Sequence, residues 1–430
     1  MSLKCFSKIL GECIQPLIKS CPKYVGTDKQ TSRENKAGFL KSLNHIIDYI
    51  FQDIHRSMKL VQSKLIATGN CFQANVKNDK NQFLTPGAYN SRFLPEATRE
   101  YINENEKYQL IYNCPIQDRK CTLIFTLFSD EDIHNIAEYD KYAKLIYCWL
   151  HICNDYSKKK CSKTLRVFFY FTPFRKWLPK ETTSILGPPH VNSAFSSVCA
   201  PEGEIVIFRR EEWLKVFIHE TFHAFGFDDG LHYSDDLNNN IRKVFLLDID
   251  FKVGEAYTES WARIINCIFY SYMNTIQKNK TKQQFNQYVH ASLQLERIYS
   301  IYQMQKVLRF MGLTYDNLHK KSETDAFLRK NMYREQTGVF GYFILGGIIM
   351  NDFYGFMKWC AANNSGFIQF QNTQGNRNKF ASFLNKGSKS DILHKTLECI
   401  LHETIQCKSK PELDLFRKTM RMSAIDQMCF

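Results

Sequence analysis

The stretch Val216–Phe225 most constrains what this chain can fold into. It has the sequence Val-Phe-Ile-His-Glu-Thr-Phe-His-Ala-Phe, in which a His-Glu-x-x-His pattern lies among apolar residues. An apolar run of this length predicts a buried helix, and two histidines four residues apart then share one helix face. Both imidazoles can therefore reach a single metal ion, and zinc is the metal that this spacing favours.

The residue that follows the first histidine adds a third functional group. Glu220 can hold a metal-activated water and take its proton, which is the role of a general base in hydrolysis. The alternative is an ordinary buried helix, in which His219 and His223 only form a polar edge. The uncharged residues on both sides of the motif favour the metal-binding interpretation.

A catalytic zinc ion needs a third protein ligand and one open position. Glu255 is the preferred candidate, and it lies 32 residues after His223 in a segment, Gly254–Arg263, that predicts a helix. Glu259 follows four residues later on the same helix face. One carboxylate can then bind the metal while the other accepts the second ring N–H of His219 and orients it.

The two motifs, HExxH and GExxxE, resemble those of the gluzincins, the thermolysin-like and neprilysin-like zinc metallopeptidases. The resemblance covers about residues 120–270 and implies zinc ligands at His219, His223 and Glu255, with Glu259 supporting His219. The chain departs from the family where Glu259 replaces the usual aspartate and where Gly254 replaces a frequent asparagine. Neither departure removes a group that the chemistry needs.

A closer resemblance is to predicted zinc peptidases of large cytoplasmic DNA viruses. It is carried by Pro189–Ser196, Val216–Phe225 and Glu255–Ala262, and it implies a location in the host cytoplasm or in the virion. The 15 cysteines occur singly, without CxxC pairs, which predicts an intracellular protein with reduced thiols. The resemblance does not identify a substrate.

Asp229 is the alternative third ligand. It completes the pattern His-Glu-x-x-His-x-x-Gly-x-x-Asp, in which Gly226 would turn the chain so that Asp229 reaches the metal. That set resembles metzincins with an aspartate ligand, which also need a methionine turn beneath the metal. Met273 is the nearest downstream methionine, but it lies at the end of a predicted helix. We therefore prefer Glu255.

The order of predicted elements indicates an α+β fold. Apolar residues from Phe39 to Val61 recur at helical spacing and predict a long amphipathic helix, whereas Asn, Gly and Pro make 67–118 an irregular segment, a linker or lid. Strands are predicted at 121–128, 165–171 and 204–208, a short strand at 190–197, helices at 132–153 and 210–225, and mostly helices beyond 255.

This order is similar to that of zincins and implies three parts. Residues 1–115 form an N-terminal helical and irregular extension. Residues 116–230 form the zincin-like upper subdomain, a small mixed sheet with the HExxH helix. Residues 231–430 form a mostly helical lower subdomain with the third ligand.

The segment 190–197 is a candidate for substrate binding. Asn192, Ala194 and Phe195 resemble the edge strand of thermolysin-like enzymes, although Ser193 intervenes between Asn192 and Ala194. Zincins bind an extended peptide by adding it to such an edge. The alternative is a surface turn after two prolines.

Charge and hydropathy restrict the partners. The net charge of +14 is compatible with an anionic partner, but the basic residues are spread along the chain, so nucleic acid is not expected as the main ligand. No apolar run is long enough to predict a membrane span. The expected partner is a peptide or protein substrate, and the sequence does not determine the oligomeric state.

Two functions of different class follow. The first is a zinc metallopeptidase with Zn²⁺ as cofactor and Glu220 as general base, and an endopeptidase is preferred over an exopeptidase. The second is a non-catalytic virion, scaffold or binding protein that retains a peptidase fold. An intact Glu220 favours the enzyme. The donor that would stabilise the oxyanion is left open among Tyr257, Tyr270, His290, Tyr302 and Tyr342.

Overall fold

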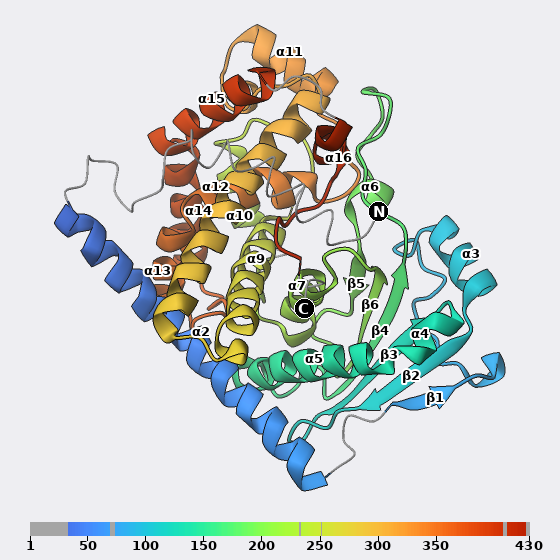
Figure 1. Cartoon of the computed structure of the whole chain (residues 1–430). Helices are drawn as coiled ribbons and strands as arrows, with labels where there is room; N and C mark the ends of the chain where they lie inside the picture. Colours follow the sequence, from blue (N-terminus) through green and yellow to red (C-terminus); the bar gives the residue numbers. More distant parts are fainter. Residues whose placement is uncertain (1–32, 69–73, 232–233, 251, 407–410, 427–430) are drawn as a thin grey trace. The chain divides into compact units, whose positions relative to one another are not determined.

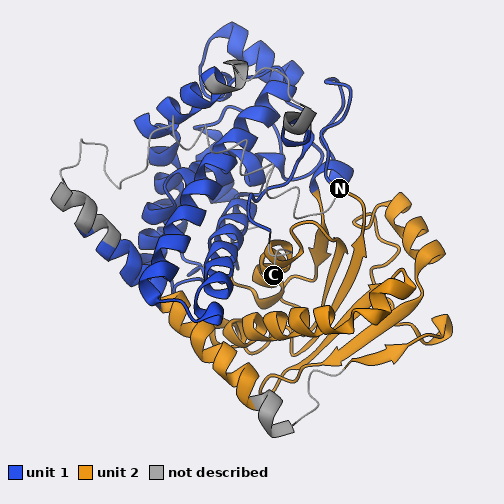
Figure 2. Ribbon diagram, viewed as in Figure 1, with its two compact units in different colours: residues 1–48, 176–191, 228–430 blue, residues 49–175, 192–227 orange. Residues whose placement is uncertain are grey.

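The computed structural model describes residues 33–68, 74–231, 234–250, 252–406 and 411–426 (Figure 1). The first 32 residues of the predicted N-terminal extension lie outside the described residues. The chain divides into two compact units (Figure 2). Unit 1 comprises 1–48, 176–191 and 228–430, and unit 2 comprises 49–175 and 192–227. The three-part division by chain position stays a prediction.

Unit 2 contains a six-stranded mixed sheet with the order β1-β2-β3-β4-β6-β5. Its three inner strands β3, β4 and β6 run parallel, while β2 is antiparallel to β3 and β5 is antiparallel to β6. The strands are β1 Asn75–Lys77, β2 Tyr108–Asn113, β3 Lys120–Leu127, β4 Thr164–Thr172, β5 Ala194–Ser196 and β6 Glu202–Arg209. The sheet and the helices around it confirm a mixed α+β composition.

Strand β4 is buried on both faces, which explains its nearly continuous run of apolar residues. On one face Phe168 and Tyr170 belong to a cluster with Ile102 of α3 (Glu96–Asn105). On the other face Phe169 contacts Phe217 of α7 (Trp213–Phe225), with ring centroids 5.9 Å apart. The sheet therefore lies between a layer containing α3 and a layer containing α7.

Helix α5 (Ile136–Tyr156) contacts α7 and is preceded by the short helix α4 (Asp130–His134). The single helix predicted over 132–153 is thus two helices that meet at Asn135. The long helix predicted from Phe39 is α2 (Arg33–Thr68). The strand predicted at 190–197 is shorter, because α6 (Pro188–Val191) occupies its first residues.

The prediction that 67–118 is irregular is wrong for much of the segment. It contains β1, the 3-10 turn η1 (Lys80–Gln82), α3 and β2. Strand β2 lies next to β3 in the sheet and is mostly buried. The Asn, Gly and Pro residues that suggested a linker lie mainly before Pro95, the residue that precedes α3. The Asn, Gly and Pro content averaged over 67–118 therefore concealed the helix and strand at 96–113.

Unit 1 is mostly helical, as predicted for the chain beyond 255. Helix α9 packs against α10, α12 and the π-helix η4 in its core. Its described elements are α6, α8 Asp235–Arg242, α9 Val253–Asn274, η2 Ile276–Lys278, α10 Lys282–Phe310, η3 Asp316–Leu318, α11 Glu323–Met332, η4 Phe340–Leu345, α12 Gly346–Asn351, α13 Phe353–Asn363, α14 Gln374–Ser388, α15 Asp391–Gln406 and α16 Pro411–Lys418, together with the first part of α2.

The last described residues are part of the unit 1 core. Arg421 and Asp426 form an ion pair of 2.9 Å with both side chains almost fully buried. The backbone N–H of Ile425 donates to Glu296 of α10 over 2.9 Å. None of the described helices combines the length and apolar character required to cross a membrane.

Candidate metal centre

Helix α7 carries the HExxH motif, and each of its residues is buried. The helix begins after Glu212, whose φ of 59° is left-handed, and ends at Gly226, whose φ of 70° is also left-handed. Glycine adopts this conformation without steric cost, which makes Gly226 a suitable C-terminal cap. The predicted start at residue 210 was therefore three residues early, and the predicted end at Phe225 is confirmed.

His219 and His223 point their Nε2 atoms toward the same place. The two atoms are 3.1 Å apart, and the imidazole planes are inclined by 82°. Two nitrogen ligands of one tetrahedral zinc ion, each at about 2.0–2.1 Å, lie about 3.3 Å apart. The spacing of this donor pair thus fits one zinc ion. Both side chains are nearly buried, at 6% and 7% exposure.

Glu220 is fixed by a residue that the sequence did not single out. The Ser196 hydroxyl donates to Oε2 of Glu220 over 2.6 Å. Ser196 is the last residue of β5, and β5 contacts α7. The hydrogen bond leaves the other carboxylate oxygen, Oε1, for other contacts. Only the pairing of β5 with β6 places Ser196 here, so no local sequence signal could have identified it.

Helix α7 is also held by a hydrogen bond in the core of unit 2. The indole N–H of Trp149, on α5, donates to Oγ1 of Thr221 over 2.8 Å. Thr221 in turn donates to the carbonyl of Ile218 over 2.6 Å. Trp149 is 1% exposed, so this bond forms away from solvent. It fixes the rotation of the helix about its axis and hence the direction of the motif.

The predicted substrate-binding segment contains an edge strand. Strand β5 lies at one end of the sheet and pairs with β6 on its inner side. Ala194 and Phe195 belong to β5, while Asn192 precedes it and accepts a hydrogen bond from Arg209 through its carbonyl. The Phe195 ring packs on the α3 side of the sheet. Substrate binding at this edge stays a prediction.

Glu255 and Glu259 lie on α9 in unit 1. Glu255 is in the first turn of the helix, where a carboxylate is favoured by the helix dipole. Oε1 of Glu259 accepts from Nε of Arg263 over 2.9 Å, and both side chains are 1% exposed. Arg263 also donates to Ser300 of α10. Glu259 is therefore part of a buried network in unit 1, and its predicted role toward His219 stays a prediction.

Asp229, the alternative ligand, lies in the turn that follows α7. Its neighbour Asp228 is 1% exposed and accepts from the hydroxyl of Thr258, on α9, over 3.1 Å. Met273 lies within α9, near its end, as the sequence suggested. A methionine turn at this residue is therefore absent, which weakens the metzincin alternative.

Tyr257 is a poor candidate for the oxyanion donor. Its side chain is fully buried, and its hydroxyl donates to the carbonyl of Ile368 over 2.8 Å. Burial raises the pKa of this phenol far above its ordinary value. Tyr257 therefore belongs to the core of unit 1, and an oxyanion donor among the other four candidates stays a prediction.

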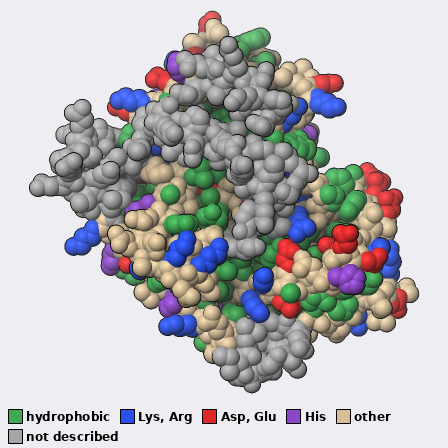
Figure 3. All heavy atoms as spheres, in the orientation of Figure 1, with side chains coloured by type: hydrophobic (Ala, Val, Ile, Leu, Met, Phe, Trp, Pro, Cys, Tyr) green, Lys and Arg blue, Asp and Glu red, His purple; other side chains and the backbone are tan. Residues whose placement is uncertain are grey.

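Unit 1 also has a pocket of about 1000 Å³, lined mostly by polar residues. They include Lys243, which follows α8, His319, which follows η3, and His394 of α15. The pocket contains none of the predicted site residues. On the face shown in Figure 3, Lys and Arg side chains lie singly or in small groups among acidic and hydrophobic ones. The described residues on that face form no continuous basic surface of the kind that binds nucleic acid.

Comparison with known proteins gave no relatives for this chain. No protein-family model, no curated protein and no solved structure matches it.

Proposed function

We propose that this protein is a zinc-dependent metallopeptidase in which His219, His223 and Glu255 bind the metal and Glu220 is the general base. The observation that carries the proposal is the 3.1 Å separation of the two Nε2 atoms on α7. Glu255, in the first turn of α9, is the third ligand that the sequence motifs predict. Two histidines and one glutamate are a ligand set of catalytic zinc.

A bound zinc ion would lower the pKa of a water ligand toward 7 and polarise the carbonyl of the scissile peptide bond. With the metal bound, Glu220 would accept a proton from the attacking water and return it to the nitrogen of the leaving amine. Ser196 holds Oε2 of Glu220 in place by hydrogen bonding. The edge of β5 offers backbone groups to which an extended peptide can pair as an added strand.

The first test is the zinc content of the purified protein, measured by mass spectrometry. Wild type, His223→Ala, Glu255→Ala and Asp229→Ala are compared after zinc loading and removal of excess metal. We expect one zinc per chain, lost in His223→Ala and Glu255→Ala and retained in Asp229→Ala. If Asp229→Ala loses zinc and Glu255→Ala retains it, Asp229 and not Glu255 is the third ligand. A wild type that binds no zinc would reject the proposal.

Activity then separates the enzyme from a binding protein with the same fold. An unfolded protein and a peptide library serve as substrates, because together they offer peptide bonds in many sequence contexts. Glu220→Gln keeps the size of the side chain but removes the base, so we expect zinc to be retained and turnover to fall by about 10²- to 10⁴-fold. Zinc binding without turnover in the wild type would favour the scaffold or binding function.

A further inference from the structure

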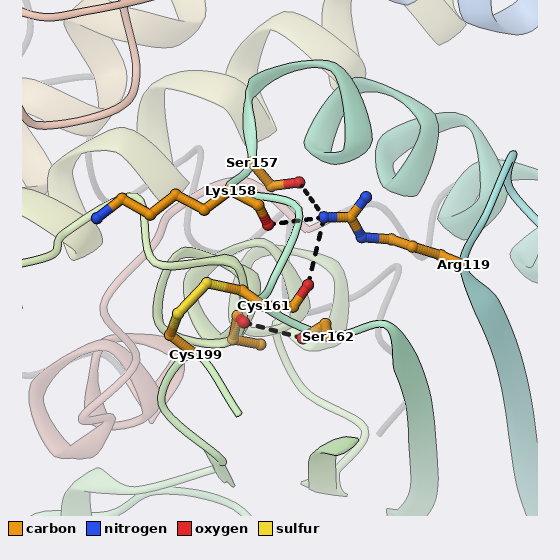
Figure 4. The surroundings of a disulfide bond; sticks show 7 residues. Arg119, Ser157, Lys158, Cys161, Ser162 and Cys199 are labelled. Carbon is orange, nitrogen blue, oxygen red and sulfur yellow. Dashed lines mark hydrogen bonds between the residues drawn. A yellow bond between two sulfur atoms is a disulfide. The ribbon is translucent and has the colours of Figure 1, made fainter. Parts of the chain in front are cut away.

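A disulfide bond packs against the C-terminal end of the metal-binding helix. It joins Cys161, in the turn after α5, to Cys199, in the loop between β5 and β6, across 38 residues (Figure 4). The prediction that all cysteines are reduced is therefore wrong for this pair. A Cβ atom added to Gly226 would lie 3.3 Å from Sγ of Cys161 and 3.4 Å from Sγ of Cys199. The sulfur atoms thus occupy the space beside Gly226, the C-terminal cap of α7.

The residues at the disulfide also satisfy the carbonyls in the last turn of α7. The N–H of Cys199 donates to the carbonyl of His223 over 3.0 Å. The hydroxyl of Ser162 donates to the carbonyl of Ala224 over 2.9 Å. Carbonyls in the last turn of a helix lack their regular partner four residues later in the chain. The His223 carbonyl also accepts from the N–H of Gly226 over 3.2 Å, so the N–H of Cys199 is a second donor to it. One of these two carbonyls belongs to a predicted metal ligand.

Arg119 holds the Cys161 side of this arrangement. Its Nη2 donates to the carbonyls of Lys158 and Cys161, over 2.9 Å and 3.3 Å, and to the hydroxyl of Ser157. Its guanidinium lies over the ring of Phe225, 5.6 Å from the centroid. Arg119, which directly precedes β3, thus contacts both the turn around Cys161 and helix α7. Figure 4 shows its polar contacts with the turn.

The backbone on both sides of the S–S bond is strained. Cys199 has a φ of 44° and Ser162 has a φ of 49°. This left-handed conformation is uncommon in residues other than glycine and persists only where surrounding contacts hold it. A cross-link is one such contact, so its removal allows these residues to relax. Relaxation at Cys199 would move the N–H that bonds to His223.

We propose that the Cys161–Cys199 disulfide positions His223 for metal binding and that its reduction weakens the affinity for zinc. The proposal rests on the metal site proposed above. A dithiol can carry out the reduction: it supplies two electrons and two protons, the S–S bond becomes two thiols, and the dithiol becomes a disulfide. Cys199 is a partly exposed residue next to Val198, which is 54% exposed, so we propose that the dithiol attacks from this side.

The test compares wild type with the double variant Cys161→Ser and Cys199→Ser in the full-length chain. Zinc affinity is measured by competition with a chromogenic chelator, and amide hydrogen exchange is followed at residues 199, 226 and 227. We expect the Kd for zinc to rise at least tenfold and exchange at these amides to accelerate. Cys399→Ser, which changes a partly exposed cysteine of unit 1, is the matched control and should leave both unchanged.

If the double variant does not fold, the wild type reduced with a phosphine and desalted under nitrogen replaces it. Thiol counting confirms the reduction, and reoxidation should restore the affinity. A role limited to global stability would lower the free energy of unfolding without changing the Kd for zinc, which would overturn the proposal. Unchanged exchange at the three amides would overturn it as well. Absence of zinc from the oxidised wild type would instead reject the proposed function itself.

Discussion

The hydroxyl of Ser196 lies 2.6 Å from a carboxylate oxygen of Glu220, and the hydrogen bond connects the edge strand β5 to the middle of the motif helix α7. A general base must keep its oxygen aimed at the reacting water, and a carboxylate held at one oxygen has fewer rotamers available. The edge to which a peptide would pair and the group that would take the proton are therefore joined by one bond.

Ser196→Ala is expected to reduce turnover without changing zinc content. A hydrogen bond to a charged group contributes about 1.5–3 kcal/mol, which corresponds to a decrease in kcat of about tenfold to a hundredfold if the bond acts in the transition state. Steady-state kinetics on a cleavable peptide, together with metal analysis, measure this effect.

Ser197→Ala is the matched control for this substitution. The hydroxyl of Ser197 accepts from the N–H of Glu204 over 3.2 Å, on the strand pair rather than on the motif. We expect its turnover to stay within about twofold of the wild type. Equal decreases in both variants would show that the loop as a whole matters and that the bond to Glu220 does not.

The parts of the fold that the sequence predicted correctly are those with strong local patterns. Strands β3, β4 and β6 are short, nearly continuous apolar runs, and α7 and α9 have apolar residues around most of their circumference. Burial of an entire element leaves a signal in its own residues. Helices α7 and α9 also carry the HExxH and GExxxE motifs, so the sequence alone placed both motifs on helices.

The features that sequence analysis missed depend on contacts between distant residues. Ser196 reaches Glu220 only because β5 pairs with β6 in one register. Cys161 and Cys199 are 38 residues apart and meet because β4 and β6 are neighbours in the sheet. No periodicity encodes such pairs. Glu255, the proposed third ligand, is partly predictable. Its helix α9 was predicted from the sequence, whereas its binding to the metal is a proposal.

Gly341→Ala is expected to displace the start of α9 and to weaken zinc binding. A Cβ atom at Gly341, in the π-helix η4, would lie 3.1 Å from the carbonyl of Lys252 and 3.2 Å from Cβ of Glu255. Such overpacking costs about 1–3 kcal/mol. We expect the Kd for zinc to rise about threefold to tenfold, as measured by chelator competition, with a matching loss in the free energy of unfolding.

Gly375→Ala provides the control, because no atom lies within 4 Å of the added Cβ on α14. Its zinc affinity should equal that of the wild type, and its stability should be equal or slightly higher because alanine favours helix. Unchanged zinc affinity in a destabilised Gly341→Ala protein would argue against Glu255 as a ligand.

Trp149→Phe is expected to destabilise the protein by about 2–3 kcal/mol. The substitution removes the 2.8 Å hydrogen bond to Thr221 and leaves a cavity beside α7. Urea denaturation measures the change. Trp177→Phe is the control, because this tryptophan is 37% exposed, and a surface substitution changes stability by about 0.5 kcal/mol or less. Similar losses in both variants would show that indole volume matters more than the bond to Thr221.

The wild type is expected to lose stability as the pH rises, and Glu335→Gln is expected to remove this loss. Burial raises the pKa of Glu335 from 4.5 to about 7, although the hydroxyl of Tyr333 and the N–H of Phe340 both donate to its Oε2 over 2.7 Å. Since the folded-state pKa lies above the unfolded-state value, the folded protein binds the proton more tightly. The free energy of unfolding therefore falls between about pH 4.5 and 7 and is constant outside that range with respect to this group.

The expected size of this fall is about 3 kcal/mol, since each unit of pKa difference corresponds to 1.36 kcal/mol. Glutamine stays neutral and can still accept from Phe340, so the variant should be more stable than the wild type at pH 8 and similar to it at pH 4.5. Urea denaturation at several pH values measures the difference between the two proteins, in which contributions from other titrating groups cancel. Glu181→Gln, at an exposed position of unit 1, should follow the wild type. Parallel stability curves for Glu335→Gln and wild type would mean that Glu335 is already ionised in the folded protein at pH 5.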